Sequence, residues 1–418
     1  MNTEKLRLDQ APPLMIPASF FLAAPVAVGA AGLLLLVQGG ALLASGWVPG
    51  TIALVHLGTL GFLGCVMLGA LVQLIPVVAG TPVPHIRLWW ATLPLLLLGT
   101  AALASGLLLG QPGAVALARG LLLLTFLLAL GPVAVALARS RSEKETSFGM
   151  RLAVLCLALG VTAGLLMAAG HAGGTFPGPR GPWIRAHQGL GLLGWVGGLL
   201  TAVSWQVVPM FYLSRPVPLG GRRAVLVLIA LGALCPPAGL LLGAGPGVAS
   251  LLAAPAVVGA WLLHPLLLAR TLATRSRKRP DPSLRAWQAG LLVAPLTAVV
   301  ALVGQLSTDP RWGVLLVWLA VWGWAGLIVH GMLTRILPFL VWFHRWSSRV
   351  GKVRVPSMRS LLPDRLAHAG LSAHGASVLL GAAAILSGWS PLGHATGLLL
   401  LATAVLLLAE LLTVLRPR

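Results

Sequence analysis

The sequence predicts an all-α integral membrane protein, a polytopic bundle of about twelve transmembrane helices that forms a single domain over residues 1–418. Of its 418 residues, 58% are hydrophobic and only 9% are charged, whereas a soluble domain has about a quarter of its residues charged. The apolar runs are continuous and rich in Leu and Ala, which is typical of membrane helices and not of the alternating strands of a membrane barrel. The basic residues also gather in alternate loops, as in other multi-pass proteins.

Each membrane helix needs about twenty mostly apolar residues to cross roughly 30 Å of hydrocarbon. The runs that meet this length predict helices at 16–44, 50–79, 88–109, 113–138, 151–171, 183–212, 222–244, 247–270, 286–306, 312–343, 365–388 and 391–415. The first run is too long for the apolar region of a signal peptide and lacks a typical cleavage site, so we expect it to remain as a helix. The expected surroundings of these helices are a lipid bilayer.

Lys and Arg are distributed unevenly between the two sets of loops that twelve helices define. All but five of the 29 fall in the set that contains both termini; the five exceptions are Arg180, Arg185 and Arg311 in the other set, and Arg119 and Arg335 within helices. The positive-inside rule then places both termini in the cytoplasm, and we expect a bacterial cytoplasmic (inner) membrane. The net charge of +21 reflects this topology and contact with anionic lipid. Because no loop is long enough for a nucleic-acid module, no nucleic-acid partner is expected.

Three of the predicted helices share a sequence pattern, which indicates an internal repeat. The second helix carries His56-Leu-Gly-Thr-Leu-Gly-Phe-Leu-Gly, and the sixth carries His187-Gln-Gly-Leu-Gly-Leu-Leu-Gly. The tenth carries Trp324-Ala-Gly-Leu-Ile-Val-His330. We refer to these three as the motif helices.

Each motif helix ends with a long polar side chain, two aliphatic residues and a proline, at Pro76, Pro209 and Pro338. The prolines lie 133 and 129 residues apart. This spacing predicts three repeats of four helices, with the motif helix always second, at approximately 16–138, 151–270 and 286–415.

Twelve helices in three four-helix arcs, with marked helices 2, 6 and 10, resemble the catalytic subunit of the heme–copper oxidase superfamily. The resemblance implies a pseudo-threefold arrangement of the arcs. It also implies that His56 corresponds to an axial ligand of the low-spin heme and His187 to a copper ligand, because both lie near the outer ends of their helices. The chain is similar in outline to the heme- and copper-containing nitric-oxide-response membrane proteins as well, but no motif assigns it to them.

The sequence also departs from the oxidases. The stretch 314–320, where that family carries His-x-His, has no histidine, and the helix at 222–244, which would supply the copper-binding pair, has none either. No tyrosine follows His187 to form the cross-linked group of the oxidases. His330 lies roughly 18 Å deeper than His56 by helix rise, and its expected neighbour is Arg335. Reduction of oxygen by the mechanism of that family is therefore not expected.

Proton conduction in the oxidases uses buried ionisable side chains. In this sequence no acidic residue lies deep in a predicted helix, and the nearest is Glu410, within two turns of the C-terminal end of the last helix. Ionisable groups at membrane depth are costly and commonly functional. Their absence argues against proton pumping and proton-coupled transport.

The cofactor expected from the resemblance is a b-type heme, with copper as the other candidate. Its expected ligands are His56 and His187, because neutral imidazole is a common protein ligand for both metals. The further candidate cofactor-binding residues are His171, His394, His330, Arg180 and Arg185. The two arginines would hold the heme propionates. Each imidazole has the alternative role of a hydrogen-bonded group at a helix end or between helices, as we expect on the cytoplasmic side for His85, His264, His344, His368 and His374.

The sequence therefore predicts a divergent heme–copper-oxidase-like protein without the oxygen-reducing centre. The expected role is electron transfer or a heme- or nitric-oxide-linked task; if the protein is an enzyme, we expect a membrane oxidoreductase. Its expected partners are a cytochrome or quinol, other membrane subunits, or a second copy of the chain. Two other function classes remain open. One is a transporter or channel in which the repeats enclose a pathway, and the other is a cofactor-free structural or assembly subunit.

Overall fold

The computed structural model describes residues 12–142, 144–277, 279 and 281–416, and every regular element within these ranges is a helix. Twelve helical spans among them are long and apolar enough to cross a membrane: Met15–Leu43, Pro49–Ala79, Ile86–Leu108, Pro112–Arg139, Glu145–His171, Arg180–Tyr212, Leu219–Leu241, Gly247–Ala273, Pro282–Leu306, Arg311–Arg349, Asp364–Ser387 and Ser390–Leu415. The prediction of an all-α polytopic bundle with twelve spans is confirmed. The arrangement in three arcs remains a prediction.

Two span ends differ most from the expected ones, and polar contacts explain both. Helix α6 (Glu145–His171) begins earlier because the Glu145 carboxylate, favoured in a first helical turn, bonds the Arg223 guanidinium at 3.2 Å. Helix α14 (Leu327–Trp346) continues further, so that the Arg345 guanidinium donates hydrogen bonds of 2.7 and 2.9 Å to the carbonyls of Leu415 and Arg416. These carbonyls end the last helix and have no partner within it.

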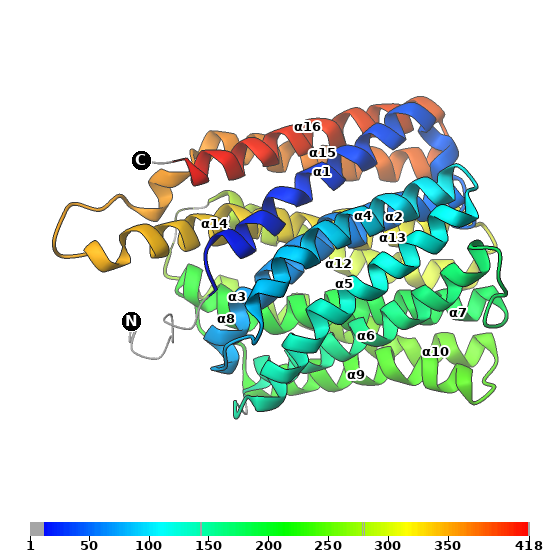
Figure 1. The fold of residues 1–418 in the computed structure, drawn as a ribbon, viewed down its shortest axis with the longest axis horizontal. Coiled ribbons are helices and arrows are strands. Elements are labelled where there is room, and N and C mark those ends of the chain that lie inside the picture. The colour runs from blue at the N-terminus through cyan, green and yellow to red at the C-terminus, as the bar shows by residue number, and fades with distance from the viewer. Residues whose placement is uncertain (1–11, 143, 278, 280, 417–418) are drawn as a thin grey trace. The chain divides into compact units, whose positions relative to one another are not determined.

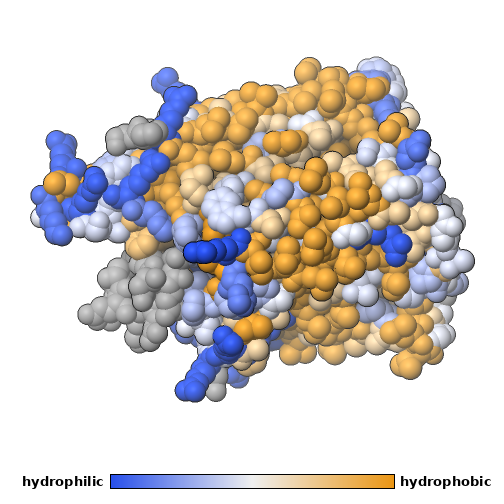
Figure 2. Space-filling model, viewed as in Figure 1, coloured by the Kyte–Doolittle hydropathy of each residue, from blue (hydrophilic) through white to orange (hydrophobic). Residues whose placement is uncertain are grey.

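The flanks of the helices are apolar where lipid is expected. Figure 2 shows hydrophobic side chains over the middle of the helices and hydrophilic ones gathered toward their ends. Leu292, Leu379 and Val405, for example, lie within helices and are 74%, 75% and 67% exposed. An exposed apolar surface of this kind suits hydrocarbon and not water.

The described chain divides into two compact units. The first unit contains residues 72–277 and 294–299, and its complete helices are α4 (Trp89–Leu108), α5 (Pro112–Arg139), α6, α7 (Arg180–Gln188), α8 (Gly198–Tyr212), α9 (Leu219–Leu241), α10 (Pro246–Val257) and α11 (His264–Ala273). The second unit contains residues 12–71, 279, 281–293 and 300–416, and its complete helices are α1 (Met15–Gln38), α2 (Pro49–His56), α13 (Arg311–Trp318), α14, α15 (Asp364–Ser387) and α16 (Ser390–Leu415). Helices α3 (Cys65–Ala79) and α12 (Pro282–Leu306) contribute to both.

In the second unit the first and last helices pack side by side (Figure 1). Glycines on both make this possible: a Cβ on Gly32 would lie 2.8 Å from the Leu401 backbone nitrogen, and a Cβ on Gly397 would overlap the Leu36 backbone. Because lipid tails are as apolar as the side chains, close backbone packing is a main source of helix association in a membrane. The glycines therefore hold α16 against α1.

All three motif helices contain a π-helical segment at the same distance from their proline. The segments are η4 (Leu57–Gly64), η6 (Gly189–Gly197) and η8 (Leu319–Gly326), and each begins 19 or 20 residues before the proline and ends 12 before it. Their spans are also the most buried of the twelve, at 78%, 83% and 83%. π-Helical turns are rare and concentrate at functional sites. A fourth segment, η7 (Val258–Leu263), lies outside the motif helices, so what distinguishes the motif helices is the shared distance of the segment from the proline together with their high burial.

We expect that Gly397→Leu lowers the thermal unfolding midpoint of the detergent-solubilised protein by several degrees, because the added side chain forces α16 away from α1 at a cost of about 1–3 kcal/mol. The matched control is Gly120→Leu on α5, where a Cβ has no neighbour within 4 Å. An equal midpoint for the two variants would contradict this account of the packing.

Candidate functional site

Three ionisable side chains meet inside the second unit, and we call them the buried triad. His330 on α14, His374 on α15 and Glu410 on α16 are 0%, 1% and 1% exposed. The Nδ1 atoms of His330 and His374 are 3.1 Å apart, and Nε2 of His330 lies 3.3 Å from Oε2 of Glu410. The three side chains thus form a hydrogen-bonded series with His330 in the middle.

Glycines make room for the buried triad. A Cβ on Gly370 of α15 would overlap Oε1 of Glu410 and would lie 3.3 Å from Nε2 of His330. A Cβ on Gly326, the last residue of η8, would lie 3.3 Å from both Cε1 and Nε2 of His374. The carboxylate and the imidazoles can therefore approach one another because the facing backbone has no side chains there.

Aromatic side chains from two motif helices pack against His374. Its ring centroid lies 6.2 Å from that of Phe62 in η4 and 6.4 Å from that of Trp322 in η8. Phe62 and Trp322 are themselves stacked, 5.9 Å apart at an interplanar angle of 9°. In addition, a Cβ on Gly58 would lie 2.8 Å from Val321, so η4 and η8 approach closely. The surroundings of His374 are therefore apolar and densely packed.

The two ends of the buried triad have unsatisfied polar atoms. Within the described residues, Nε2 of His374 and Oε1 of Glu410 have no hydrogen-bond partner. A buried polar atom without a partner typically costs about 1–3 kcal/mol, and more if charged. Other buried side chains, such as Gln73, Thr100 and His264, also have an atom without a partner. The triad differs from them because three ionisable groups contact one another.

The buried triad does not have the geometry of a metal centre. The two nitrogens of His330 lie on opposite sides of its ring and face different partners, so they cannot converge with those partners on one ion. Among the residues that the structure describes, no group of three or more His, Cys, Asp or Glu side chains is arranged to hold a metal ion. Since both nitrogens of His330 contact neighbouring side chains, we do not assign it as a cofactor ligand.

Of the other predicted site residues, the second unit contains His56 and His394. His56 is the last residue of α2, directly before η4, and its Nδ1 lies 2.7 Å from the Ile52 carbonyl oxygen. The Nδ1 of His394 lies 2.7 Å from the Leu36 carbonyl. A carbonyl can only accept, so Nδ1 is protonated in both neutral rings and the lone pair is on Nε2.

The first unit contains the other four predicted residues. His187 on α7 has its Nδ1 2.9 Å from the Gly160 carbonyl of α6, and its Cε1 would lie 2.9 Å from a Cβ on Gly164. This places the lone pair of His187 on Nε2 as well. Like His56, it lies at or near the start of a π-helical segment.

The loop between α6 and α7 brings two of these four residues to one aromatic ring. His171 meets Phe176 edge-on at 5.3 Å, and the Arg180 guanidinium lies over the same ring at 4.6 Å. Arg185 is half-buried on α7, two residues before His187. Whether these side chains hold a cofactor remains a prediction.

The structure bears on three expectations from the sequence. Glu410, expected too near a helix end to be buried, is almost fully enclosed, because its carboxylate lies against His330 of α14 and Gly370 of α15. His374 and His264, expected on the cytoplasmic side, are both buried in the protein; Nε2 of His264 lies 3.0 Å from the Ser204 hydroxyl, and the side of the membrane on which both lie stays a prediction.

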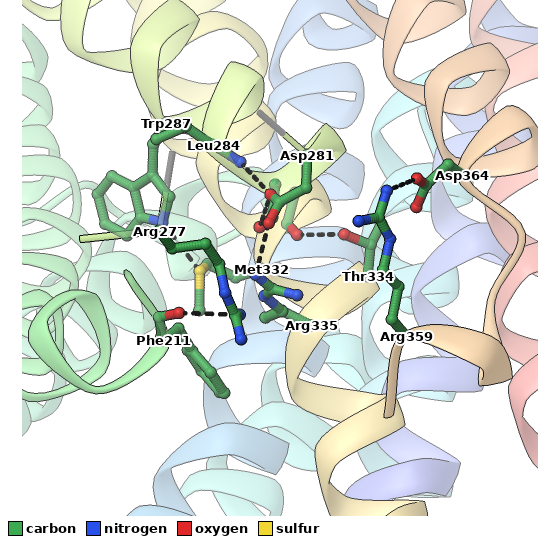
Figure 3. A network of polar contacts seen from close by, with 12 residues as sticks. Phe211, Arg277, Asp281, Leu284, Trp287, Met332, Thr334, Arg335, Arg359 and Asp364 are labelled. Atoms are coloured by element: carbon green, nitrogen blue, oxygen red, sulfur yellow. Dashed lines mark hydrogen bonds and ion pairs between the residues drawn. The ribbon is translucent and has the colours of Figure 1, made fainter. Parts of the chain in front are cut away.

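The third correction concerns the partner of Arg335, which is Asp281 and not His330. Asp281 precedes α12, caps it by accepting a hydrogen bond of 2.9 Å from the Leu284 backbone N–H, and forms an ion pair with Arg335 (Figure 3). One turn away, the Trp287 indole N–H donates to the Met332 sulfur at 2.9 Å. These contacts attach the start of α12 to α14, and the Asp281 carboxylate neutralises the charge of Arg335. His330 instead contacts His374 of α15 and Glu410 of α16. The sequence signal that was missed is Asp281 itself, which lies directly before Pro282.

No protein-family model matches the chain, and no curated protein sequence matches it either.

Asp281→Asn should lower the stability of the folded protein by about 1–3 kcal/mol, because asparagine retains the helix cap but leaves a half-buried guanidinium without its carboxylate. Asp309→Asn is the matched control, since its ion pair with Arg311 is more exposed and is worth at most about 1 kcal/mol. Thermal unfolding in detergent measures both. A larger loss for Asp309→Asn would show that burial does not determine the strength of these pairs.

Proposed function

We propose that this protein binds b-type heme, or copper, through membrane-embedded neutral histidines that include His56 and His187, for electron transfer or a nitric-oxide-linked task. The observation that carries the proposal is the shared hydrogen bond from Nδ1 to a backbone carbonyl, at 2.7 Å in His56 and 2.9 Å in His187. Metal-binding histidines commonly donate their second N–H in this way, which fixes the ring and directs the lone pair of Nε2 to the metal.

The positions of the two histidines support the same role. His56 directly precedes η4, and His187 lies two residues before η6. In the third motif helix the residue directly before η8 is Trp318, whose indole N–H donates to the Val378 carbonyl at 3.0 Å. Two of the three motif helices thus have an imidazole within two residues of the start of the π-helical segment, and the third has an indole that bonds to α15.

Cationic groups for heme propionates are available beside His187. Arg180 lies seven residues before His187, which places it on the same face of α7 two turns away. Arg185 lies on the same helix, nearer to His187. A b-type heme requires an axial imidazole, apolar walls and such cations, and α7 with η6 supplies groups of each kind.

The proposed setting is a bacterial inner membrane with both termini in the cytoplasm, as the distribution of Lys and Arg indicates. A cytochrome or a quinol would exchange electrons with the cofactor. A protein without a cofactor would instead be a transporter, a channel or an assembly subunit.

We expect the purified protein to show a reduced-minus-oxidised absorption spectrum with b-type bands, at about one heme per chain, with metal content measured on the same sample. His56→Ala and His187→Ala should each lower heme or copper content while the protein still inserts into the membrane. The control is His344→Ala, because that side chain is exposed near the end of α14. Full cofactor content in both ligand variants, or a colourless and metal-free protein, would refute the proposed function.

A further inference from the structure

We propose that the buried triad is a proton relay, in which Glu410 is a proton-binding site inside the membrane and receives its proton through His374 and His330. None of the three residues is a ligand in the function proposed above, and the relay requires no heme. Ionisable groups buried in membrane helices are costly, and they persist where a proton, an ion or a substrate needs them. Here the hydrogen-bonding pattern itself points to a proton.

When Glu410 is ionised, the contacts permit a single arrangement of the ring protons. Oε2 of Glu410 accepts from Nε2–H of His330, so Nδ1 of His330 carries a lone pair. That lone pair accepts from Nδ1–H of His374. Nε2 of His374 is then left with a lone pair. It has no hydrogen-bond partner of good geometry among the described residues, and the backbone of Trp322 is the polar group that the His374 ring approaches besides His330.

A proton that binds Nε2 of His374 can therefore reach Glu410 in two transfers. The Nδ1 proton of His374 passes to Nδ1 of His330, and the Nε2 proton of His330 passes to Oε2 of Glu410. One proton has entered, both imidazoles are again neutral, and the carboxylate has become a carboxylic acid. No oxidant, reductant or other reactant takes part, and the reverse sequence releases the proton.

Both ends of the relay face a glycine. Gly326 lies against Nε2 of His374, and Gly370 lies against Oε1 of Glu410. No side chain from these two positions covers the atom where the proton enters or the oxygen at the far end. The same glycines that make room for the buried triad thus place backbone, and no side chain, against its two terminal atoms.

The charged groups nearby do not neutralise Glu410. Its ion-pair partner within the described residues is His330, which is charged only when protonated. Arg335, five residues further along α14, is paired with Asp281. On α15, the Nδ1 of His368 is bonded to the Asp364 carbonyl at 2.7 Å. An ionised carboxylate without a fixed cation is unfavourable in apolar surroundings, and binding a proton removes that charge.

The test is an infrared measurement on the whole protein in lipid vesicles after a rapid drop in pH. We expect a carboxylic-acid C=O band to appear, to shift when glutamate is labelled with ¹³C at the side-chain carboxyl, and to be absent in Glu410→Gln. Only eight acidic residues occur in the chain, so the band can be assigned. If Glu410→Gln does not fold, the labelled variant with Glu4→Gln, Glu143→Gln and Glu145→Gln decides the question, because Glu410 is then the one glutamate left in the chain.

The relay itself is tested by His374→Phe, which retains an aromatic ring between Phe62 and Trp322. We expect the band to reach its normal final intensity but to appear about 10²-fold more slowly, the scale of a lost proton-transfer group. The matched control is His264→Phe, which replaces another fully buried histidine in the first unit and should leave the rate unchanged. Absence of a titrating glutamic-acid band in the natural protein, or an unchanged rate in His374→Phe, would overturn the proposal, whatever the heme content.

Discussion

Hydrocarbon offers no hydrogen bonds, and this constraint governs the whole structure because every buried polar group must find its partner within the protein. The backbone meets it by forming helices throughout the described residues. Buried hydroxyls meet it locally: Thr125 and Thr403, for example, donate to the carbonyl four residues earlier. The buried triad meets it by a hydrogen-bonded series of three ionisable side chains, and the relay proposed above accounts for such groups at this depth.

Glycine is the main means by which these polar groups are brought together. Helix association in a bilayer depends on close packing and not on exclusion of water, so the absence of a Cβ determines which helices meet. Gly32 and Gly397 hold α16 against α1, while Gly370 admits Glu410 of α16 to the surface of α15. The depth and orientation of the carboxylate therefore follow from packing contacts along the whole length of α16.

One π-helical segment connects the two proposed sites in the second unit. His56 directly precedes η4, and Phe62, within η4, packs against the ring of His374. A change of charge at a cofactor bound by His56 would act on the buried triad, and a change of charge in the triad would act on the cofactor. The surroundings between them are densely packed and apolar, and electrostatic interactions are stronger there than in water. The motif helices thus carry the cofactor ligand proposed for this unit and an aromatic wall of the relay on a single element.

The twelve spans could be predicted from the amino-acid sequence, because each follows from the length of a local apolar run. The repeated His, Gly and Pro residues likewise identified the motif helices. Prediction from the sequence failed for the contacts of His330, whose partners lie 44 and 80 residues away and are not its near neighbour Arg335. It also failed for Glu410, whose burial depends on the helix that covers it and not on its distance from a helix end. These contacts could be read from the folded protein alone, because the faces that helices present to one another depend on packing between distant segments, which no local sequence pattern records.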